Sequence, residues 1–148
     1  AIGDLKESGR LDARPGFLDL GTGSGILAIG LALLGCRGVG LDIDPQAVAC
    51  AEENVAANGV SDRVVLATGS MDCLAPDKTF GVIVANILSG PLIALSRDIV
   101  PHLAPGGTLV LSGILAEQAP GVASAYARLG LGEPKTLIDG EWAALIWS

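Results

Sequence analysis

Short apolar runs alternate with amphipathic stretches along most of the chain. The apolar runs are rich in Val, Ile and Leu, as expected for buried parallel strands, and lie at residues 17–20, 39–43, 63–67, 80–85 and 108–112. Between them the sequence predicts helices at residues 26–34, from 44 to 58, from 90 onward and at 117–129. Strands that alternate with helices predict βαβ units, so we expect an α/β fold with a doubly wound, mostly parallel sheet.

The end of the chain departs from this alternation. Residues 135–138 and 142–147 are both strand-like, and Asp139-Gly140-Glu141 between them is a hairpin signal. A hairpin reverses the chain direction, so the last strand is predicted to run antiparallel to the rest of the sheet.

Composition indicates one core and no transmembrane segment. The chain has 148 residues, of which 50% are apolar and 17% charged, and its net charge is −7. An average domain has about 25% charged residues, so part of this surface is expected to meet another domain or protein. The acidic balance disfavours direct nucleic-acid binding. No apolar run approaches the roughly 18 residues that span a bilayer, which predicts a soluble protein without membrane contact.

The cysteines and the first residues add two expectations. Cys36, Cys50 and Cys73 are odd in number and lack C-x-x-C spacing, which indicates reduced thiols in a cytoplasmic protein and neither disulfides nor a metal site. Residues 1–16 are mixed and polar, and are interpreted as the remnant of a linker or helix from a missing N-terminal region. The domain itself is predicted to span residues 17–148.

A glycine-rich turn between the first strand and its helix is the main candidate for ligand binding. Gly21, Gly23 and Gly25 allow positive φ angles and a close approach of the backbone to a ligand. The dinucleotide fingerprint G-x-G-x-x-G would place its third glycine at Ile26, so this spacing differs from it. The turn, including Thr22, instead resembles the first motif of methyltransferases that use S-adenosylmethionine.

Asp42 is the predicted ribose ligand. It ends the second strand, beside the glycine turn in such sheets, and its carboxylate can accept hydrogen bonds from both ribose hydroxyls. Asp44 precedes Pro45 and is expected to cap the next helix, whereas Asp42 has no comparable local role.

Two further positions follow strands at the same predicted edge. Ser70, Met71 and Asp72 come after the third strand, and the sequence does not choose between an adenine-binding loop and a solvated turn. Ser70 and Met71 are nevertheless retained as candidate cofactor contacts. Asn86 follows a very apolar strand and is predicted to orient an incoming amine as well as to touch the cofactor. Its alternative role is that of a turn or cap residue before Pro91.

The single histidine and the two tryptophans are interpreted as structural residues. The single His102 is expected at a helix C-terminus or on the surface. The two Trp residues flank the last strand and are expected to pack in the core or at an edge.

Several motifs resemble the PrmA family, the methyltransferases of large-subunit ribosomal protein eleven. They are Leu18-Asp-Leu-Gly-Thr-Gly-Ser-Gly-Ile-Leu-Ala-Ile29, Gly40-Leu-Asp-Ile-Asp-Pro-Gln46, Asn58-Gly-Val-Ser-Asp-Arg63, Val84-Ala-Asn-Ile-Leu88, Ser112-Gly-Ile-Leu115 and Gly140-Glu-Trp142. The resemblance covers most of the chain. It implies a class I, Rossmann-like methyltransferase sandwich with S-adenosyl-L-methionine as cofactor.

The resemblance also implies an activity and a partner. The expected reaction is methylation of lysine ε-amino and N-terminal α-amino groups of a ribosomal protein in the cytoplasm, and Gly21, Asp42 and Asn86 fall on the family's cofactor-binding positions. The alternatives are a methyltransferase for a small molecule or RNA, and a cofactor-binding domain without turnover. A nicotinamide enzyme is disfavoured by Ile26 and by the terminal hairpin.

Overall fold

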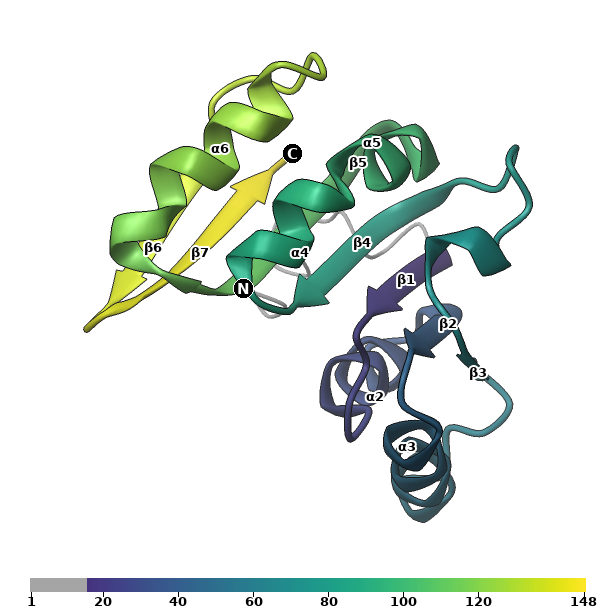
Figure 1. Ribbon diagram of the computed structural model, residues 1–148. Coiled ribbons are helices and arrows are strands. Elements are labelled where there is room, and N and C mark those ends of the chain that lie inside the picture. Colours follow the sequence, from purple (N-terminus) through teal and green to yellow (C-terminus); the bar gives the residue numbers. More distant parts are fainter. Residues whose placement is uncertain (1–15) are drawn as a thin grey trace. The chain divides into compact units, whose positions relative to one another are not determined.

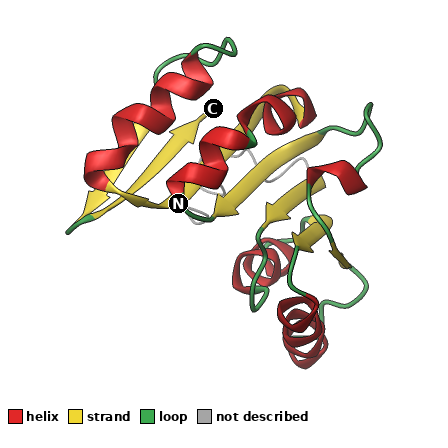
Figure 2. Cartoon of the chain, viewed as in Figure 1, coloured by secondary structure: helices red, strands yellow, loops and turns green. Residues whose placement is uncertain are grey.

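The computed structural model describes residues 16–148. The chain divides into two compact units, residues 1–75 and 76–148. Figure 1 labels the helices and strands, and Figure 2 shows how the two kinds of element alternate along the chain. The predicted linker at residues 1–16 lies outside the described residues except for Gly16, so the predicted domain boundary stays a prediction.

The first unit holds a parallel sheet in the order β3-β2-β1. Its elements are β1 (Gly16–Leu20), α2 (Ile26–Leu33), β2 (Arg37–Asp42), α3 (Pro45–Ala57), β3 (Val64–Thr68) and the short 3-10 helix η1 (Met71–Cys73). Phe17, Leu18, Leu31 and Leu41 are almost fully buried, and they supply the apolar contacts that hold α2 to the strands. The predicted strands and helices of this half of the chain are confirmed to within a residue or two.

The second unit holds strands in the order β4-β5-β7-β6. Its elements are β4 (Phe80–Asn86), α4 (Ser89–Ala94), α5 (Ser96–Ile99), η2 (Val100–His102), β5 (Leu103–Leu115), η3 (Ala116–Gln118), α6 (Ala119–Ala127), β6 (Lys135–Asp139) and β7 (Trp142–Trp147). β4 and β5 are parallel, whereas β7 is antiparallel to both of its neighbours. The predicted hairpin and the antiparallel last strand are therefore confirmed.

The strand predicted at residues 108–112 is longer at both ends in the structure, where β5 spans Leu103–Leu115. β5 already begins at Leu103, which pairs with Phe80, and pairing resumes where Thr108 meets Val82. The intervening residues bulge out of the ladder, and Gly106 takes a φ of +73° there. Turn residues can thus interrupt a strand locally without ending it.

The single helix predicted from Gly90-Pro91 onward is wrong, because α4 and α5 are separated at Leu95. The Ser96 hydroxyl donates a hydrogen bond of 2.8 Å to the Ile93 carbonyl, and the Asp98 amide bonds to the Leu95 carbonyl in a tighter turn. A serine side chain that competes for backbone carbonyls bends or interrupts a helix in this way. His102 ends this helical segment, which is the first of its two predicted positions, and it is buried with Nδ1 against the Lys78 carbonyl instead of lying on the surface.

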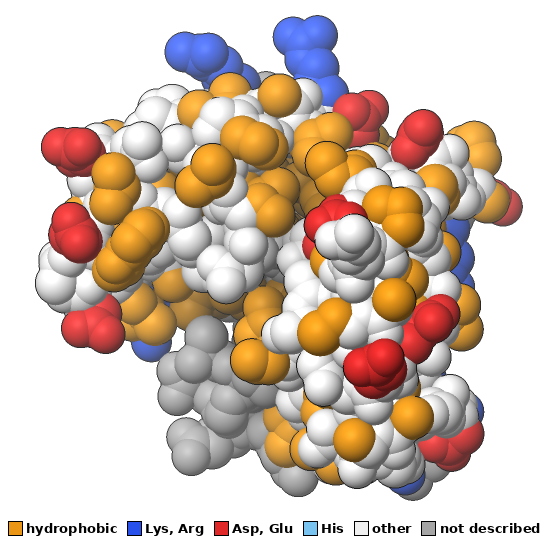
Figure 3. All heavy atoms as spheres, turned by 60° about the horizontal axis from the view of Figure 1, so that its bottom comes forward, with side chains coloured by type: hydrophobic (Ala, Val, Ile, Leu, Met, Phe, Trp, Pro, Cys, Tyr) orange, Lys and Arg blue, Asp and Glu red, His pale blue; other side chains and the backbone are white. Residues whose placement is uncertain are grey.

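The surface is sparsely charged, as the composition predicts. On the face shown in Figure 3, hydrophobic side chains are spread between scattered acidic and basic ones. Large apolar side chains that are exposed include Ile26, Ile43, Val65, Leu88, Ile138 and Trp142. Within residues 16–148, none of the helices is long and apolar enough to cross a membrane.

Candidate functional site

The glycine turn lies between β1 and α2, as predicted. Gly21, Gly23 and Gly25 have φ angles of +72°, +56° and +86°, which side chains with a Cβ rarely adopt. A Cβ on Gly25 would also lie 3.2 Å from the Cβ of Ala51 on α3. The turn therefore depends on glycine both for its backbone angles and for its packing.

The amides of this turn are bonded to the end of β2. The Gly21 and Thr22 amides donate to the Leu41 carbonyl at 2.8 and 2.9 Å. The Gly23 amide donates to Asp42 Oδ2 at 2.9 Å, and the Asp44 amide donates to Asp42 Oδ1 at 3.0 Å. The structure thus brings Gly21, Thr22, Gly23 and Asp42 together, as the sequence predicts.

Asp42 nevertheless has the local role that the sequence interpretation denied it. Its carboxylate holds the turn against β2, because each of its oxygens accepts one backbone amide. An ionised carboxylate offers about four acceptor positions, so two stay available. Asp44 caps α3 as expected, accepting the Gln46 amide at 2.9 Å. The two aspartates are therefore correctly distinguished, although Asp42 both builds the turn and can bind a ligand.

Asp19 is a buried residue of the glycine turn that was not singled out from the sequence, although it lies inside the first motif. Only 1% of its surface is exposed. Its Oδ2 accepts hydrogen bonds from the Thr22 hydroxyl at 2.8 Å and from the Ala28 amide at 3.1 Å. Asp19 therefore joins the glycine turn to the first turn of α2. A charged residue inside a short apolar strand was the signal for it.

The second oxygen of Asp19 is unusual. Oδ1 is buried without a hydrogen-bond partner among the described residues. Burial raises the pKa of Asp19 to about 6, against the opposing effect of the hydrogen bonds from Thr22 and Ala28. A carboxylate in this position is costly, so the local structure favours the protonated form as the pH falls.

The loop after β3 also lies against Asp42. The Gly69 amide donates to the Asp42 carbonyl at 2.8 Å, and Ser70 follows directly, half-buried. Met71 is only 5% exposed, so its side chain belongs to the core of this unit, whereas Asp72 points to solvent. Of the predicted adenine contacts, Ser70 is therefore the more accessible and Met71 is the less accessible.

Asn86 lies in the second unit, at the last position of β4 and opposite Ser112 of β5. Its side chain is exposed and makes no hydrogen bond with any residue that the structure describes. Next to Ser112, Gly113 has a φ of +77°, and a Cβ there would lie 2.6 Å from Asn86 Oδ1. The pairing of β5 with β7 is irregular at the same place, between Leu111 and Ile114. The bulge and its glycine make room for the Asn86 amide.

A cavity of about 530 Å³ opens beside Asn86. Ser112 and Gly113 of β5 line one side of it, and the β6–β7 hairpin, including Trp142 and Asp139, lines the other. A lining that combines a few polar side chains with apolar ones is typical of small-ligand sites.

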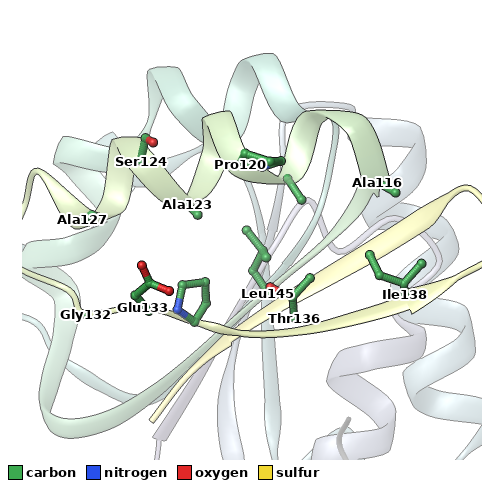
Figure 4. A pocket seen from close by; sticks show the side chains of 12 residues that line it. Ala116, Pro120, Ala123, Ser124, Ala127, Gly132, Glu133, Thr136, Ile138 and Leu145 are labelled. Carbon is green, nitrogen blue, oxygen red and sulfur yellow. The ribbon is translucent and has the colours of Figure 1, made fainter.

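A second cavity, of about 440 Å³, lies between α6 and the β6–β7 hairpin (Figure 4). Ala123, Ala127 and Pro120 line it from the helix, and Thr136 and Leu145 line it from the strands. Glu133 is the charged side chain in this lining. This cavity holds no candidate residue from the sequence, and the described residues contain no cluster that could bind a metal ion.

Comparison with protein families gives a match over nearly the whole chain. Residues 6–148 match the model described as ribosomal protein L11 methyltransferase (PrmA). The protein of that name from Pelobacter propionicus is 46% identical over 134 residues, which cover 90% of this chain and 43% of the relative. The one from Brucella suis is 43% identical over 145 residues, which cover 95% of this chain and 51% of the relative. The chain thus spans about half the length of these curated relatives.

Solved structures agree over the whole chain. A ribosomal protein L11 methylase from Lactobacillus delbrueckii subsp. bulgaricus has a TM-score of 0.85 and 33% identity, covering 99% of this chain and 78% of that one. An RNA methyltransferase from Salinibacter ruber, in complex with S-adenosyl-L-homocysteine, has a TM-score of 0.75 and 24% identity, covering 99% and 88%. At that identity the second similarity shows the fold alone. The predicted class I methyltransferase fold is confirmed.

Proposed function

The chain belongs to the ribosomal protein L11 methyltransferase (PrmA) family, and on that premise we propose that it transfers methyl groups from S-adenosylmethionine to amines of a ribosomal protein. The acceptors in this proposal are lysine ε-amino groups and the N-terminal α-amino group. The observation that supports S-adenosylmethionine as the cofactor is the ordered glycine turn. In this turn each oxygen of the Asp42 carboxylate accepts one backbone amide. The proposal includes a cytoplasmic location, which the acceptor and the reduced thiols both fit.

The first unit fits the cofactor in its hydrogen-bonding capacity. Asp42 keeps two acceptor positions after bonding the Gly23 and Asp44 amides, and a ribose presents two hydroxyl donors. The turn itself carries no Cβ at Gly21 or Gly23, so a bulky ligand can approach its backbone closely. We assign ribose binding to Asp42, cofactor contact to Gly21, Thr22 and Gly23, and adenine contact to Ser70 and Met71, with Ser70 the more accessible of the two.

Asn86 is assigned to the acceptor amine. Its amide oxygen can accept an N–H of the amine, and this bond fixes the direction of the nitrogen lone pair. Gly113 lets the side chain lie in this place, since any Cβ there would displace Oδ1. Orientation of this kind is a large part of what an enzyme supplies to a two-reactant step.

The amine must lose a proton before it can react. A lysine amine has a pKa of about 10.4, and its protonated form has no lone pair. When bound, S-adenosylmethionine supplies an electrophilic methyl group on a cationic sulfur, which accepts the electron pair of the broken C–S bond as the N–C bond forms. A neighbouring positive charge and loss of solvent both lower the pKa of an amine, so the chain needs no dedicated base in this proposal.

Other acceptors and a loss of turnover are the rival functions. The net charge of −7 disfavours an RNA acceptor, because nothing in the overall charge attracts phosphates. A cofactor-binding domain without turnover would keep the turn, Asp42 and the predicted cofactor contact of Asn86, but would not use Asn86 to orient an amine.

Calorimetric titration tests the cofactor half of the proposal. We expect S-adenosylmethionine to bind and NAD not to bind, with a large loss of affinity in Asp42→Ala. Binding of NAD in place of S-adenosylmethionine, or unchanged affinity in Asp42→Ala, would contradict the assignment.

The acceptor half needs labelled cofactor and purified ribosomal protein L11. We expect incorporation of label with this chain or with a version that carries the additional length of its relatives, and loss of incorporation in Asn86→Ala of the active form. Label on RNA, or no label with either length, would overturn the acceptor assignment while leaving cofactor binding intact.

A further inference from the structure

The strand β6 has an accessible edge. It is the last strand in the order β4-β5-β7-β6, so β7 is its one neighbour among the described residues. Four of its five residues are exposed, and Ile138 is 58% exposed. An edge strand presents backbone N–H and C=O groups that can pair with a further strand. β6 is therefore a surface to which another strand can be added.

The register of the hairpin shows which backbone groups of β6 face this edge. Asp139 and Trp142 close the turn at Gly140-Glu141, which makes them a hydrogen-bonded pair. Such pairs alternate along an antiparallel ladder, so the backbone groups of Leu137 also face β7. Thr136 and Ile138 lie at the alternate positions, and their N–H and C=O groups therefore point to the open edge.

The sequence of β6, Lys-Thr-Leu-Ile-Asp, is complementary to itself in the antiparallel direction. When two copies pair about Leu137, Lys135 of each copy lies opposite Asp139 of the other. Both side chains are exposed, and opposite charges at directly paired positions stabilise a sheet. The same alignment sets Thr136 opposite Ile138, so the residues with outward-facing backbone groups meet, as a hydrogen-bonded ladder requires. A parallel alignment in register would instead set like charges opposite each other.

The groove between β6 and α6 leaves room for a second copy. The side chains of Thr136 and Ile138 face the cavity of about 440 Å³ on this side of the strand (Figure 4). The α6 residues that line it are all small: Ala119, Pro120, Ala123, Ser124 and Ala127. Antiparallel pairing of identical strands has a twofold axis perpendicular to the sheet, so both copies of α6 would lie on the same face. Small side chains on the facing sides of these helices keep them from colliding.

We propose that β6 pairs with β6 of a second copy of this chain, antiparallel and centred on Leu137, in a twofold-symmetric dimer. Thr136 of each copy exchanges both backbone hydrogen bonds with Ile138 of the other, and each Lys135 forms an ion pair with an Asp139. The inference goes beyond the proposed function and does not depend on it. Because Asp139 also lines the Asn86 cavity, Lys135 of the second copy lies beside that cavity.

Charge reversal tests this alignment, because two single variants should fail alone and succeed together. Lys135→Glu sets Glu opposite Asp139, and Asp139→Lys sets Lys opposite Lys135, so each variant should dimerise about tenfold more weakly than the unaltered chain. In an equimolar mixture of the two variants, every paired position again carries opposite charges, and the heterodimer should form with the affinity of the unaltered dimer. Sedimentation equilibrium measures these constants, at concentrations up to about 0.5 mM because the contact is small.

Lys78→Glu and Asp77→Lys are the matched controls. Both side chains are exposed in the loop before β4, and the substitutions change the net charge by the same amounts. Neither variant, alone or mixed with the other, should change dimerisation. The indole N–H signal of Trp147 reports the folded state of every variant, because this buried side chain donates through Nε1 to the Gly132 carbonyl at 2.7 Å.

Amide hydrogen exchange identifies the strand that forms the contact. The amides of Thr136 and Ile138 should exchange about tenfold more slowly at high than at low protein concentration, whereas the Leu137 amide, already facing β7, should change little.

Three results would overturn the proposal. The first is a monomer at every concentration, in which case the charges of Lys135 and Asp139 protect the edge from pairing. The second is a mixture of the two variants that dimerises as weakly as each variant alone. The third is a dimer without protection of Thr136 and Ile138. Titration of S-adenosylmethionine tests the proposed function separately, since a monomer that binds the cofactor removes this inference alone.

Discussion

The polar groups of the glycine turn in the first unit are hydrogen-bonded within the chain, whereas the side-chain amide of Asn86 at the cavity of the second unit is not. In the turn, the amides of Gly21, Thr22 and Gly23 and the Asp42 carboxylate are bonded to one another or to the neighbouring strand. At the cavity, the Asn86 side chain makes no hydrogen bond with any described residue. The glycine turn, here called the ordered region, is fixed by its own hydrogen bonds before a ligand binds. The Asn86 cavity, here called the open region, has polar groups whose hydrogen bonds a ligand would supply.

The difference corresponds to the two reactants of the proposed reaction. A cofactor is the same molecule in every turnover, so a turn fixed in advance loses little conformational entropy on binding it. Acceptor amines on a protein differ in their surroundings, and exposed groups such as Trp142 and Asn86 adapt to them at little cost. Exposed polar groups are solvated, so leaving them without protein partners is not destabilising.

Of the substitutions considered, removal of the Asp42 carboxylate should weaken cofactor binding at the ordered region most. Asp42→Ala is expected to weaken S-adenosylmethionine binding about 1,000-fold, because two hydrogen bonds to a charged group are lost, each contributing roughly 2 kcal/mol. The measurement is calorimetric titration of the cofactor.

Asp44→Ala is the control for this substitution, because it removes a carboxylate two residues away. It deletes the cap of α3 and should lower the free energy of unfolding by about 1 kcal/mol while cofactor affinity stays the same. A loss of cofactor affinity in Asp44→Ala as large as in Asp42→Ala would show that general disorder at this edge, and not ribose binding, causes the effect.

The buried Asp19 should make the ordered region sensitive to pH. Burial raises the pKa of Asp19 from 3.8 to about 6, so the folded chain binds this proton more tightly than the unfolded chain does. The associated stability is fully present below pH 3.8 and is lost as the pH rises through about 6. A shift of about two pKa units corresponds to at most about 3 kcal/mol in the free energy of unfolding.

Urea unfolding between pH 3.5 and pH 7.5 measures this dependence. Asp19→Asn keeps an oxygen for Thr22 and Ala28 but cannot ionise, so its stability should change less over the window from pH 4 to pH 6. Identical pH profiles for the unaltered chain and Asp19→Asn would mean that other groups dominate and that the buried oxygen is accommodated without cost.

In the open region, substitution of Gly113 should have the largest effect on stability and on methyl transfer. Gly113→Ala is expected to lower the free energy of unfolding by about 2 kcal/mol, since its φ of +77° strains a side chain and its Cβ meets Asn86 Oδ1 at 2.6 Å. Methyl transfer should fall at least tenfold while cofactor affinity is retained, which separates the two regions. Chemical unfolding and single-turnover transfer measure the two effects.

Gly121→Ala provides the comparison for Gly113→Ala. Gly121 lies in α6 with no atom near its added Cβ, and helix propensity there favours alanine by up to about 1 kcal/mol. Methyl transfer that falls equally in both variants would remove the special role of Gly113.

The ordered region was the more predictable of the two. Its glycines, Asp42 and the Asp44-Pro45 cap are close in sequence to the strands they serve, so local chain chemistry determines their places. The role of Asp19 could not be predicted, because it depends on the segments that pack over this side chain. The burial of one residue cannot be inferred from a short apolar strand. The adenine contact of Met71 stays a prediction, and the burial of its side chain could not be seen in the sequence for the same kind of reason.

The open region was predicted less completely. Asn86 and the hairpin follow from strand endings and a turn signal, but the bulges in β5 do not. The glycines near Leu103 and at Gly113 allow either a turn or a bulge, and the choice depends on what β4 and β7 pair with across the sheet. For the same reason, the sequence could not indicate that Trp142, expected to pack in the core or at an edge, is half exposed beside Asn86.

The smallest effect tests how far the order of the turn depends on α3. Asn54 donates through Nδ2 to the Ser24 carbonyl at 2.8 Å, across a separation of 30 residues. Asn54→Ala should weaken cofactor binding about fivefold, the equivalent of one neutral hydrogen bond of about 1 kcal/mol. Asn58, one helical turn further on, donates to the Asn54 carbonyl at 2.7 Å and never reaches the turn. Asn58→Ala should therefore cost similar stability in urea unfolding but leave the calorimetric affinity alone. If the two variants lose affinity equally, α3 stabilises the unit as a whole and the turn is ordered by β2 and Asp42 without it.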